Sequence, residues 1–440
     1  MSEPLRIALA GLGTVGGGVI RLIETNADLI ARRAGRRIEI VAVAARDRSK
    51  DRGVDLSRYA WEDDMTAMAA REDVDVVVEL VGGSDGPALT LARNTLATGK
   101  DLVTANKAMI ANHGLELAEL AEKADAALKF EAAVAGGIPV IKGLKEGVAA
   151  NEINRVYGIL NGTCNYILST MEDTGRDFGD VLAEAQAKGY AEADPTFDID
   201  GIDAAHKLAI LSSVAFGTKI DFKGVAATGI RRIVAADIAQ ADVLGYYIRL
   251  IGMADTEVDA DGNRRLFQRV QPHLVHRDHP LAHVDGATNA VVAEGNFVGR
   301  LLFQGPGAGD GPTASAVVAD IIDIARGDIG APFSIPVAEL AEAPPAATGH
   351  RIGSAYLRFT VADRPGALAE ITAAMRDAGV SIESLIQKGT PGAAAGDADN
   401  VLVHMVTHDG PESAITQALA LLDGSPCLVQ PPVVLPILDE

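Results

Sequence analysis

The sequence predicts an α/β protein of three consecutive domains: a doubly wound parallel sheet, a mixed α+β domain and a small C-terminal domain. Three observations lead to this fold class. Strand-like and helix-like stretches alternate over residues 1–130, a proline- and alanine-rich stretch interrupts the chain at residues 331–350, and strand and helix patterns resume after it. The length of 440 residues allows about three domains of ordinary size.

The first domain, residues 1–130, begins as a strand, a tight turn and a helix. Residues 5–10 (LRIALA) form a short apolar run, a glycine-rich turn follows, and apolar residues then recur at helical spacing. Strands connected by helices form a parallel sheet covered on both faces, so we expect a Rossmann-like, doubly wound sheet. We expect a helix at about residues 311–328 to complete it. Further β-branched runs predict strands at residues 37–44, 73–80 and 101–105.

The remainder of the chain is predicted to form two more domains. Residues 131–310 mix helical sequence with alternating strand-like runs, which indicates an α+β domain. The composition of residues 331–350 is typical of a linker. Over residues 351–440 the predicted order is strand, helix, strand, strand, helix, strand, with a glycine- and alanine-rich connection at residues 391–399. This is the ferredoxin-like order, so we expect an independent small domain.

The charge balance excludes some classes of protein. There are 60 acidic and 39 basic residues, a formal net charge of -21, and the resulting field repels polyanions. We therefore expect neither general nucleic-acid binding nor binding to acidic membranes. The two cysteines, Cys164 and Cys427, allow at most one disulfide, which favours a reducing compartment. With no basic leader and no uncharged apolar stretch of about 18 residues, the chain is expected to be a soluble cytoplasmic protein.

The strongest local motif is GLGTVG, residues 11–16, between the first strand and the first helix. Gly11 allows a tight turn, Gly13 lets backbone approach a pyrophosphate, and Gly16 lets the helix pack on the strand. Because free N–H groups at the helix start attract phosphate, the motif predicts dinucleotide binding, with an ordinary strand–helix turn as the alternative. After the second strand stands Arg46, which favours NADP(H) over NAD(H). A solvated arginine beside Asp47 is the alternative.

Two lysines are candidates for chemistry. Lys107 follows the fourth strand at the carboxyl edge of the predicted sheet, where such sheets bind ligands, although a solvated lysine is equally compatible. Asp203 and Lys207 lie four residues apart and share one face of a predicted helix. On a surface this pair would be ordinary; in a cleft the lysine can protonate a developing alkoxide. The same segment is rich in carboxylates that can bind an ammonium group: Glu192, Asp194, Asp198 and Asp200.

Other motifs have less specific interpretations. Four histidines, at positions 273, 276, 279 and 283, invite a metal site, but their spacings share no helix face and Pro280 interrupts them. Cys164 invites comparison with a catalytic thiol, but no partner histidine is identifiable, so we favour a structural role. The turn Pro365–Gly366 begins a helix whose N–H groups can receive a small carboxylate, and a plain turn is the alternative.

Taken together, these motifs resemble the monofunctional homoserine dehydrogenase family with a C-terminal ACT regulatory domain. The resemblance covers essentially the whole chain, and the most specific stretch is GYAEADPTFDIDGIDAAHK at residues 189–207. Further matching motifs are GLGTVG (11–16), TANK (104–107), EAAVAGGIPVI (131–141), NGTCNYIL (161–168), HPLAHVDGATNAV (279–291) and GPGAG (305–309). The resemblance implies reversible NAD(P)H-dependent reduction of L-aspartate 4-semialdehyde to L-homoserine, on the route to threonine, methionine and isoleucine.

The resemblance also implies roles for individual residues. Residues 131–310 would bind substrate and mediate dimerisation, with Lys207 as proton donor and Lys107 as a second lysine near substrate. Sodium would bind near Glu131 and the carbonyls of Val134, Gly136 and Ile138. Threonine would act through the ACT domain, and a homodimer or homotetramer is expected. Substrate would be held by Glu192, Asp203, Asp198 and Thr163, and the cofactor by Gly11, Gly13, Thr14, Val15, Gly16, Arg46, Lys107, Gly189 and Gly309.

Two other functions are compatible with parts of the sequence. One is another semialdehyde or amino-acid dehydrogenase that uses Cys164 as an acylating thiol. The other is a catalytically inert, nucleotide-sensing regulator, suggested by an ACT-like tail on a dinucleotide-binding domain. The negative net charge argues against a DNA-binding regulator, and the intact set Glu192, Asp203 and Lys207 argues against an inert one.

Overall fold

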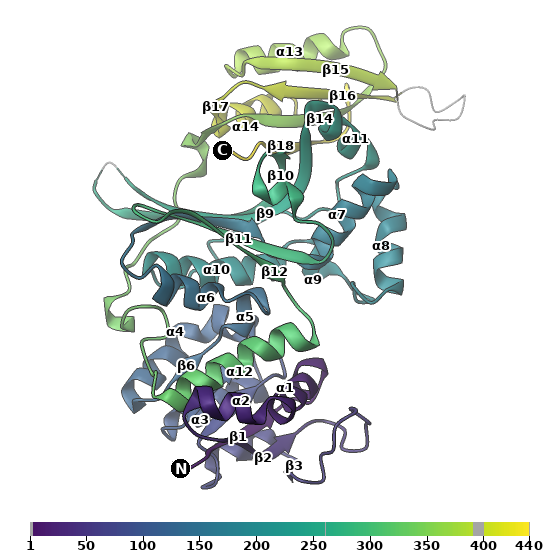
Figure 1. The fold of residues 1–440 in the computed structure, drawn as a ribbon. Helices are drawn as coiled ribbons and strands as arrows, with labels where there is room; N and C mark the ends of the chain where they lie inside the picture. The colour runs from purple at the N-terminus through teal and green to yellow at the C-terminus, as the bar shows by residue number, and fades with distance from the viewer. Residues whose placement is uncertain (1–2, 260, 390–399, 440) are drawn as a thin grey trace.

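A computed structural model of the chain describes residues 3–259, 261–389 and 400–439. Three units follow one another from the N-terminus at one end to the last unit at the other (Figure 1). This α/β architecture confirms the predicted fold class. The predicted glycine- and alanine-rich connection, residues 391–399, lies outside the described residues. In the described residues, no helix is long and apolar enough to cross a membrane.

The first unit is a six-stranded sheet in which every pairing is parallel, in the order β3-β2-β1-β4-β5-β6. From β1 the chain builds the sheet outward on one side through β2 and β3, and then on the other side through β4, β5 and β6. This is the Rossmann arrangement. The strands are β1 (Leu5–Ala10), β2 (Ile38–Ala44), β3 (Ala60–Glu62), β4 (Val76–Glu79), β5 (Asp101–Thr104) and β6 (Leu128–Lys129). Four of them match the predicted runs, with β4 shorter than expected, while β3 and β6 were not predicted.

Helices cover both faces of this sheet. One face packs against α3 (Pro87–Ala97) and α4 (Lys107–Ala124), with buried residues such as Leu91 and Met109. The other face packs against α1 (Thr14–Thr25), α2 (Ala27–Ala34) and α12 (Asp310–Arg326). Helix α12 corresponds to the helix expected at about residues 311–328. The chain returns to the first unit in α12, after it has formed the middle unit, and α12 lies alongside α1. The chain therefore passes between the two units more than once.

The middle unit is a mixed sheet with the order β12-β11-β7-β9-β10-β8, in which only the β8–β10 pairing is parallel. Helix α10 (Ile202–Phe216) packs on β7, β9 and β10 of this sheet and also on α4 of the first unit. The strands are β7 (Ile153–Ile159), β8 (Ala226–Ala227), β9 (Tyr246–Val258), β10 (Arg264–His276), β11 (Thr288–Gly295) and β12 (Gly299–Pro306). The other helices are α5 (Ala132–Ala135), α6 (Val140–Lys142), α7 (Gly162–Thr174), α8 (Phe178–Ala187), α9 (Thr196–Ile199) and α11 (Ala235–Leu244).

The C-terminal unit is an antiparallel four-stranded sheet with the order β15-β16-β14-β18, covered by two helices. This is the ferredoxin-like topology that the order of elements predicted. The elements are β14 (Ala355–Ala362), α13 (Ala367–Asp377), β15 (Ile382–Gly389), β16 (Asn400–Thr407), α14 (Glu412–Leu421) and β18 (Leu428–Pro436). A short ladder joins β13 (Ile352–Gly353) to β17 (Gly410–Pro411).

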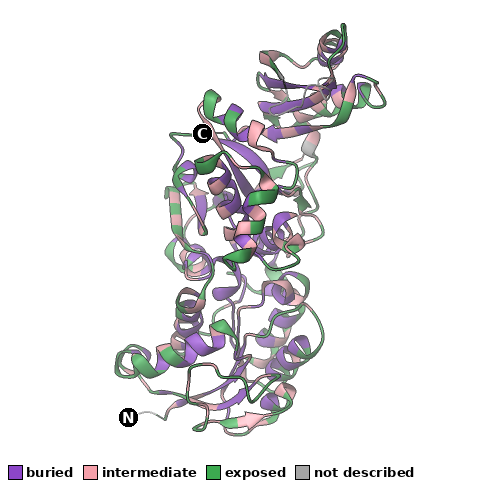
Figure 2. Ribbon diagram, turned by 90° about the vertical axis from the view of Figure 1, so that its right-hand side faces the viewer, coloured by how far each residue is buried: buried purple, intermediate pink, exposed green. Residues whose placement is uncertain are grey.

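The predicted linker packs against both the first and the middle units rather than spanning open space. Phe333, Val337 and Leu340 in this stretch are buried, and Leu266 of β10 bridges to Pro345. Colouring by burial shows buried strands inside each of the three units (Figure 2). The last unit is therefore held to the middle one by packed chain as well as by direct contacts.

Candidate active site

A cavity of about 590 Å³ lies between the first unit and the middle unit. The cavity brings together segments that are far apart in sequence: the glycine turn, the start of α4, the start of α7 and one face of α10. Among the residues expected at the site, those that line it are Val15, Lys107, Val134, Gly136, Thr163, Gly189, Asp198, Asp203, Lys207 and Gly309. The structure thus gathers most of the predicted set at the carboxyl edge of the parallel sheet, where doubly wound folds bind ligands.

The glycine turn has the backbone that dinucleotide phosphates need. Gly11 has φ +102°, and a Cβ there would lie 2.7 Å from the carbonyl carbon of Leu80. A Cβ at Gly16 would lie 2.1 Å from the carbonyl oxygen of Gly11, so only glycine allows the turn and α1 to pack this closely. Gly13 precedes α1, and a Cβ there would meet nothing within 4 Å, so the helix start is open to phosphate. The residues present fit a bound dinucleotide.

Arg46 is exposed, directly after β2 and Ala45, and it does not line the cavity. Two further arginines that the sequence analysis did not single out lie nearby. Arg52 donates through Nε to the carbonyl of Leu12 in the glycine turn, at 3.0 Å. The guanidinium groups of Arg48 and Arg52 lie 5.5 and 5.9 Å from the ring centroid of Trp61. A cluster of arginines therefore follows β2, where a ribose phosphate would be recognised.

The centre of the cavity is one carboxylate held between two ammonium groups. Asp203 is buried, and its Oδ2 lies 2.8 Å from Lys207 Nζ while its Oδ1 lies 3.1 Å from Lys107 Nζ. Burial alone would raise the pKa of Asp203, but the two lysines outweigh it and hold that pKa well below its usual range. The carboxylate is therefore ionised near neutrality. Lys207 also donates to the carbonyl of Leu160, at 2.8 Å.

Asn161 orients the two aspartates of the site, and the sequence analysis did not identify it. Its Nδ2 donates to Asp198 Oδ1 at 2.8 Å and to Asp203 Oδ2 at 2.9 Å. Its Oδ1 accepts from the backbone N–H of Cys164 at 2.7 Å and so caps α7. Burial raises the pKa of Asp198. An asparagine directly before the first residue of a helix is a capping signal that could have drawn attention to this position.

The remaining predicted substrate residues differ in their positions. The Thr163 hydroxyl donates to the carbonyl of Tyr190 at 2.8 Å, so it lines the cavity with its donor already used. Glu192 is exposed, and it is not among the residues that line the cavity. Gly189 and Gly309 have positive φ values of +77° and +116°, and both border the cavity from the middle unit side.

Glu131, beside which a sodium ion was expected, has a carboxylate that is already hydrogen-bonded. Its carboxylate accepts from the backbone N–H groups of Ile141 and Lys142, at 2.9 and 2.8 Å. Burial and the neighbouring Asp320 raise the pKa of Glu131 to about 7. Because the side chain is already engaged by backbone donors, any cation here would be held mainly by carbonyl oxygens of the short segment around α5.

The alternative motifs do not form reactive sites. Cys164 is buried, its thiol donates to the carbonyl of Asp198, and burial raises its pKa well above the usual value, which suppresses the nucleophilic thiolate. His273 and His276 lie on β10, whereas His279 and His283 lie beside and within the turn that follows it. Within the described residues, the side chains that could jointly hold a metal ion are Glu146, Asp323 and Asp328.

The fold and the site together define a dinucleotide-dependent oxidoreductase with a ferredoxin-like C-terminal domain. Comparisons with known proteins agree. The family model described as "Homoserine dehydrogenase, NAD binding domain" matches residues 11–131, the model "Homoserine dehydrogenase" matches residues 139–322, and the model "ACT domain" matches residues 355–423. The chain belongs to the homoserine dehydrogenase family, and it is an oxidoreductase that acts on a CH–OH group.

Individual relatives support this assignment over nearly the full length. The homoserine dehydrogenase of Pseudomonas aeruginosa is 44% identical over 430 residues and that of Neisseria gonorrhoeae 45% over 436 residues, with at least 96% of each chain covered. The crystal structure of a homoserine dehydrogenase from Thiobacillus denitrificans has 40% identity and a TM-score of 0.91 with 99% coverage of both chains. A hyperthermophilic archaeal homoserine dehydrogenase in complex with NADPH has 26% identity and a TM-score of 0.61, covering 73% of this chain and 97% of its own.

Proposed function

We propose that the protein catalyses the reversible reduction of L-aspartate 4-semialdehyde to L-homoserine with NADPH as the preferred cofactor. The observation that carries this proposal is the Lys207–Asp203–Lys107 arrangement inside the cavity that the glycine turn borders. A bound nicotinamide dinucleotide supplies the hydride. Addition of hydride to the aldehyde carbon leaves negative charge on its oxygen, and the residues of this chain have to stabilise and protonate that oxygen.

Lys207 is the proposed proton donor. An ammonium group has three N–H donors, and two of those of Lys207 are used by Asp203 and by the carbonyl of Leu160. The third remains for a ligand in the cavity, which Lys207 lines. Asp203 keeps the ammonium in place and favours its charged form. Lys107, a third exposed and 5.7 Å from the ring of Phe197, would bind the substrate carboxylate or the developing alkoxide from the other side of Asp203.

The substrate ammonium group is proposed to bind the acidic residues beside these lysines. Asp198 lines the cavity next to Asp203 and is the carboxylate best placed for this contact. Glu192 and Thr163 complete the proposed set by family resemblance. Because Glu192 lies outside the lining residues, we assign it a smaller share of the contact than Asp198.

The preference for NADPH rests on the arginines after β2. Arg46 is exposed to solvent directly after β2, so it can approach a 2′-phosphate. Arg52, bound to the glycine turn, adds positive charge close by. The NADPH complex of the archaeal relative is consistent with this preference.

Three further proposals concern a bound cation, an effector of the ACT domain, and the oligomeric state and location of the protein. A sodium ion is proposed near Glu131 and the backbone carbonyls of Val134, Gly136 and Ile138, where the Glu131 carboxylate already accepts two backbone hydrogen bonds. The ACT domain is proposed to bind threonine and to inhibit the enzyme, which would serve threonine, methionine and isoleucine biosynthesis. A cytoplasmic homodimer or homotetramer is the proposed assembly.

One assay tests the central proposal. Purified protein is mixed with NADPH and aspartate semialdehyde, and the loss of NADPH absorbance is followed. We expect consumption that depends on the semialdehyde and needs no phosphate. Absence of consumption would refute the proposed reaction, and phosphate-dependent turnover abolished by Cys164→Ser would support an acylating dehydrogenase instead.

A further inference from the structure

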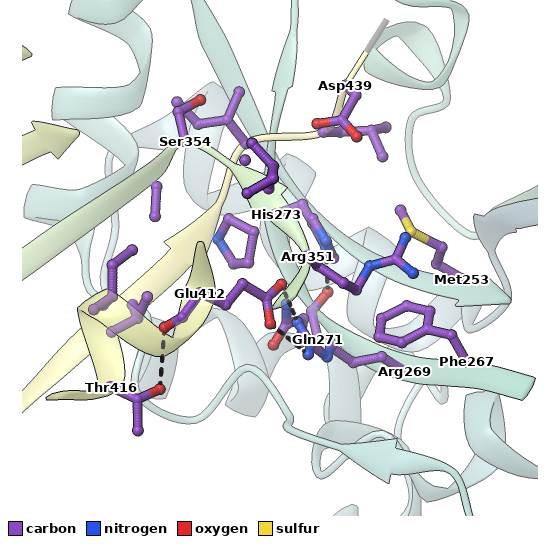
Figure 3. A pocket seen from close by; sticks show the side chains of 18 of the residues that line it. Met253, Phe267, Arg269, Gln271, His273, Arg351, Ser354, Glu412, Thr416 and Asp439 are labelled. Atoms are coloured by element: carbon purple, nitrogen blue, oxygen red, sulfur yellow. Dashed lines mark hydrogen bonds and ion pairs between the residues drawn. The ribbon is translucent and has the colours of Figure 1, made fainter. Parts of the chain in front are cut away.

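The sheet of the middle unit has two faces, and one of them supports the active site. On the first face, side chains of β10 such as Arg269 and Gln271 point toward the C-terminal unit, and Figure 3 shows Glu412 of that unit beside them. Helix α10 packs on the second face, against β7, β9 and β10. Residues on this second face can therefore support Asp203 and Lys207 from behind.

Asn289 lies on the α10 face of the sheet, at the start of β11. The antiparallel register of β7 and β11 pairs Ile159 with Ala290, so the next residues along, Leu160 and Asn289, are opposite each other. Val291, two residues further along β11, is buried in the core into which α10 packs. Because alternate residues of a strand share a face, the side chain of Asn289 points to the same side as that of Val291.

The backbone carbonyl of Leu160 accepts hydrogen bonds from both Asn289 and Lys207. Asn289 Nδ2 donates to this oxygen at 3.0 Å, and Lys207 Nζ donates to it at 2.8 Å. A carbonyl oxygen has two lone pairs, so these two donors use its full capacity. The bond from Asn289 therefore fixes the carbonyl in the direction in which it receives the ammonium group of Lys207.

Leu160 and the next residue, Asn161, together set both acceptors of Lys207. Leu160 supplies the carbonyl, and Asn161 donates to Asp203 Oδ2, the atom that lies 2.8 Å from Lys207 Nζ. The direction of the third N–H of the ammonium group depends on these two acceptors, and so on the position of this dipeptide. Asn289 binds the dipeptide from the neighbouring strand.

The burial of Asn289 is costly for stability. Only 1% of the residue is exposed, and its Oδ1 has no hydrogen-bond partner among the described residues. A buried acceptor that stays unsatisfied destabilises the folded state, and such groups are uncommon. An apolar side chain of similar size would avoid this cost. Packing alone does not explain an asparagine here, whereas its bond to the Leu160 carbonyl does.

Asn289 also contacts the glycine-rich loop that leads into α12. A Cβ at Gly307 would lie 2.1 Å from Asn289 Cγ, so only a glycine lets the backbone of this loop pack on the amide. Gly307 borders the cavity, but Asn289 itself is not among the residues that line it. Asn289 can therefore influence a reaction in the cavity only through the residues that it touches.

We propose that Asn289 is a positioning residue for the proton donor: by holding the Leu160 carbonyl, it directs the third N–H of Lys207 toward the oxygen of the substrate. This inference deepens the proposed function and rests on it. The direction of that N–H matters most when the oxygen becomes negative, which happens in the transition state. Loss of the Asn289 donor should therefore lower kcat more than it raises KM.

Asn289→Ala removes this donor and tests the proposal. We expect kcat for reduction of aspartate semialdehyde to fall about five- to tenfold, the equivalent of about one hydrogen bond. KM for the semialdehyde and the affinity for NADPH, measured by fluorescence titration, should stay within about twofold of the wild type. Thermal melting shows whether the variant folds. If it does not, Asn289→Leu, which keeps more of the volume, replaces it in every measurement.

Asn165→Ala is the matched control, because Asn165 is also a fully buried asparagine of the middle unit. Its Nδ2 donates to the carbonyls of Val284 and Gly286, at 2.7 and 2.9 Å, and its Oδ1 has no partner among the described residues. Its hydrogen bonds do not involve the Leu160 carbonyl. We expect a lower melting temperature but a kcat within about twofold of the wild type.

A double-mutant cycle with Lys207→Met separates positioning of Lys207 from general loosening of the fold. When the ammonium group is absent, Asn289→Ala should change the residual kcat by less than about twofold, because there is no donor left to direct. If the loss of kcat is the same with and without Lys207, Asn289 does not act through Lys207 and the proposal is wrong.

The other contrary results are equally clear. A normal kcat in Asn289→Ala, or an equal loss of kcat in Asn165→Ala, would refute the positioning role. A fall in NADPH affinity as large as the fall in kcat would assign Asn289 to the loop at Gly307 instead. If the wild type itself does not consume NADPH with the semialdehyde, the proposed function fails; if the wild type is active and Asn289→Ala is unaffected, only the role of Asn289 fails.

Discussion

Lys207→Met is the substitution that tests the proton-donor assignment most directly. Methionine keeps most of the length of the side chain and removes the ammonium group. Lys207 is buried, so its position is fixed by contacts rather than by solvent. After the change, Asp203 keeps Lys107 at 3.1 Å and Asn161 at 2.9 Å, so the buried carboxylate still has an ionic partner and a hydrogen-bond donor. We therefore expect the variant to fold.

The expected magnitude follows from what the ammonium group does. A positioned general acid typically contributes about 100- to 10,000-fold to the rate. Lys107 lies on the same carboxylate and can supply part of the charge stabilisation, but it lies on the opposite oxygen of Asp203 and is a third exposed. We therefore expect kcat to fall by at least about 100-fold. Because the polar partners of Lys207 are Asp203 and the carbonyl of Leu160, outside the glycine turn, affinity for NADPH should stay near that of the wild type.

The assay is NADPH oxidation at saturating aspartate semialdehyde, with NADPH binding measured separately by fluorescence titration. Lys188→Met is the control, because Lys188 is an exposed lysine paired with Glu184 outside the cavity. Its turnover should stay within about twofold of the wild type, as for surface substitutions in general. If Lys207→Met keeps near-normal turnover, or if NADPH affinity falls as much as kcat does, Lys207 is not the donor.

Three further predictions concern the cofactor, the aspartates and the C-terminal unit. Arg46→Ala should lower the ratio of kcat/KM for NADPH over NADH by about three- to tenfold without impairing NADH use, and an unchanged ratio would argue against phosphate recognition. Asn161→Ala should lower kcat by about tenfold or more, because Asp198 and Asp203 lose the amide between them, and should cost about 1 kcal/mol as a lost helix cap; normal kcat with normal melting would contradict this. Burial lowers the pKa of His404 to about 4, so the unfolded chain takes up this proton at higher pH than the folded one, and stability falls between about pH 6.5 and 4 by up to about 3 kcal/mol. His404→Asn should flatten this part of the melting-temperature profile, and an unaltered profile would show that another group causes the loss.

The topology of the first unit was largely predictable because its signals are local. Each long strand is an apolar run that the chain brackets with helical sequence, and Gly11 marks the turn after β1. Strands β3 and β6 were not predicted because they have only three and two residues, too few for a periodic pattern. They exist because β2 and β5 offer free edges to pair with. The packing of residues 331–350 could not be predicted from the sequence either, because it depends on contacts between distant residues, such as the ring of Phe333 against that of Phe130.

In the candidate site, too, some features follow from local sequence and others depend on how the helices pack. The pairing of Asp203 with Lys207 follows from their separation by one helical turn, and the structure places the two groups 2.8 Å apart. The approach of Lys107 to the same carboxylate needs α4 to pack on α10, which no local pattern specifies. The exposed position of Glu192 likewise depends on how the segment between α8 and α9 runs. Sequence therefore singled out charged groups that the structure brings together, whereas their distances from one another required the fold.

Asp203 and its two ammonium partners carry one net positive charge between them, and Asp198, the carboxylate proposed to bind the substrate ammonium group, balances that charge only until the substrate is bound. Asn161 is neutral and both of its amide hydrogens are used on carboxylates, so it restrains Asp203 without changing that balance. Beside a buried carboxylate, positive charge that is not balanced stabilises an oxygen that becomes negative only in the transition state. If Asp203 were paired with a single lysine, its charge would be fully offset in the ground state and little attraction would remain for an alkoxide. The second lysine is thus what makes a buried ion pair useful for reduction of a carbonyl, and this is why Lys107→Met should also reduce turnover although Lys207 remains in place.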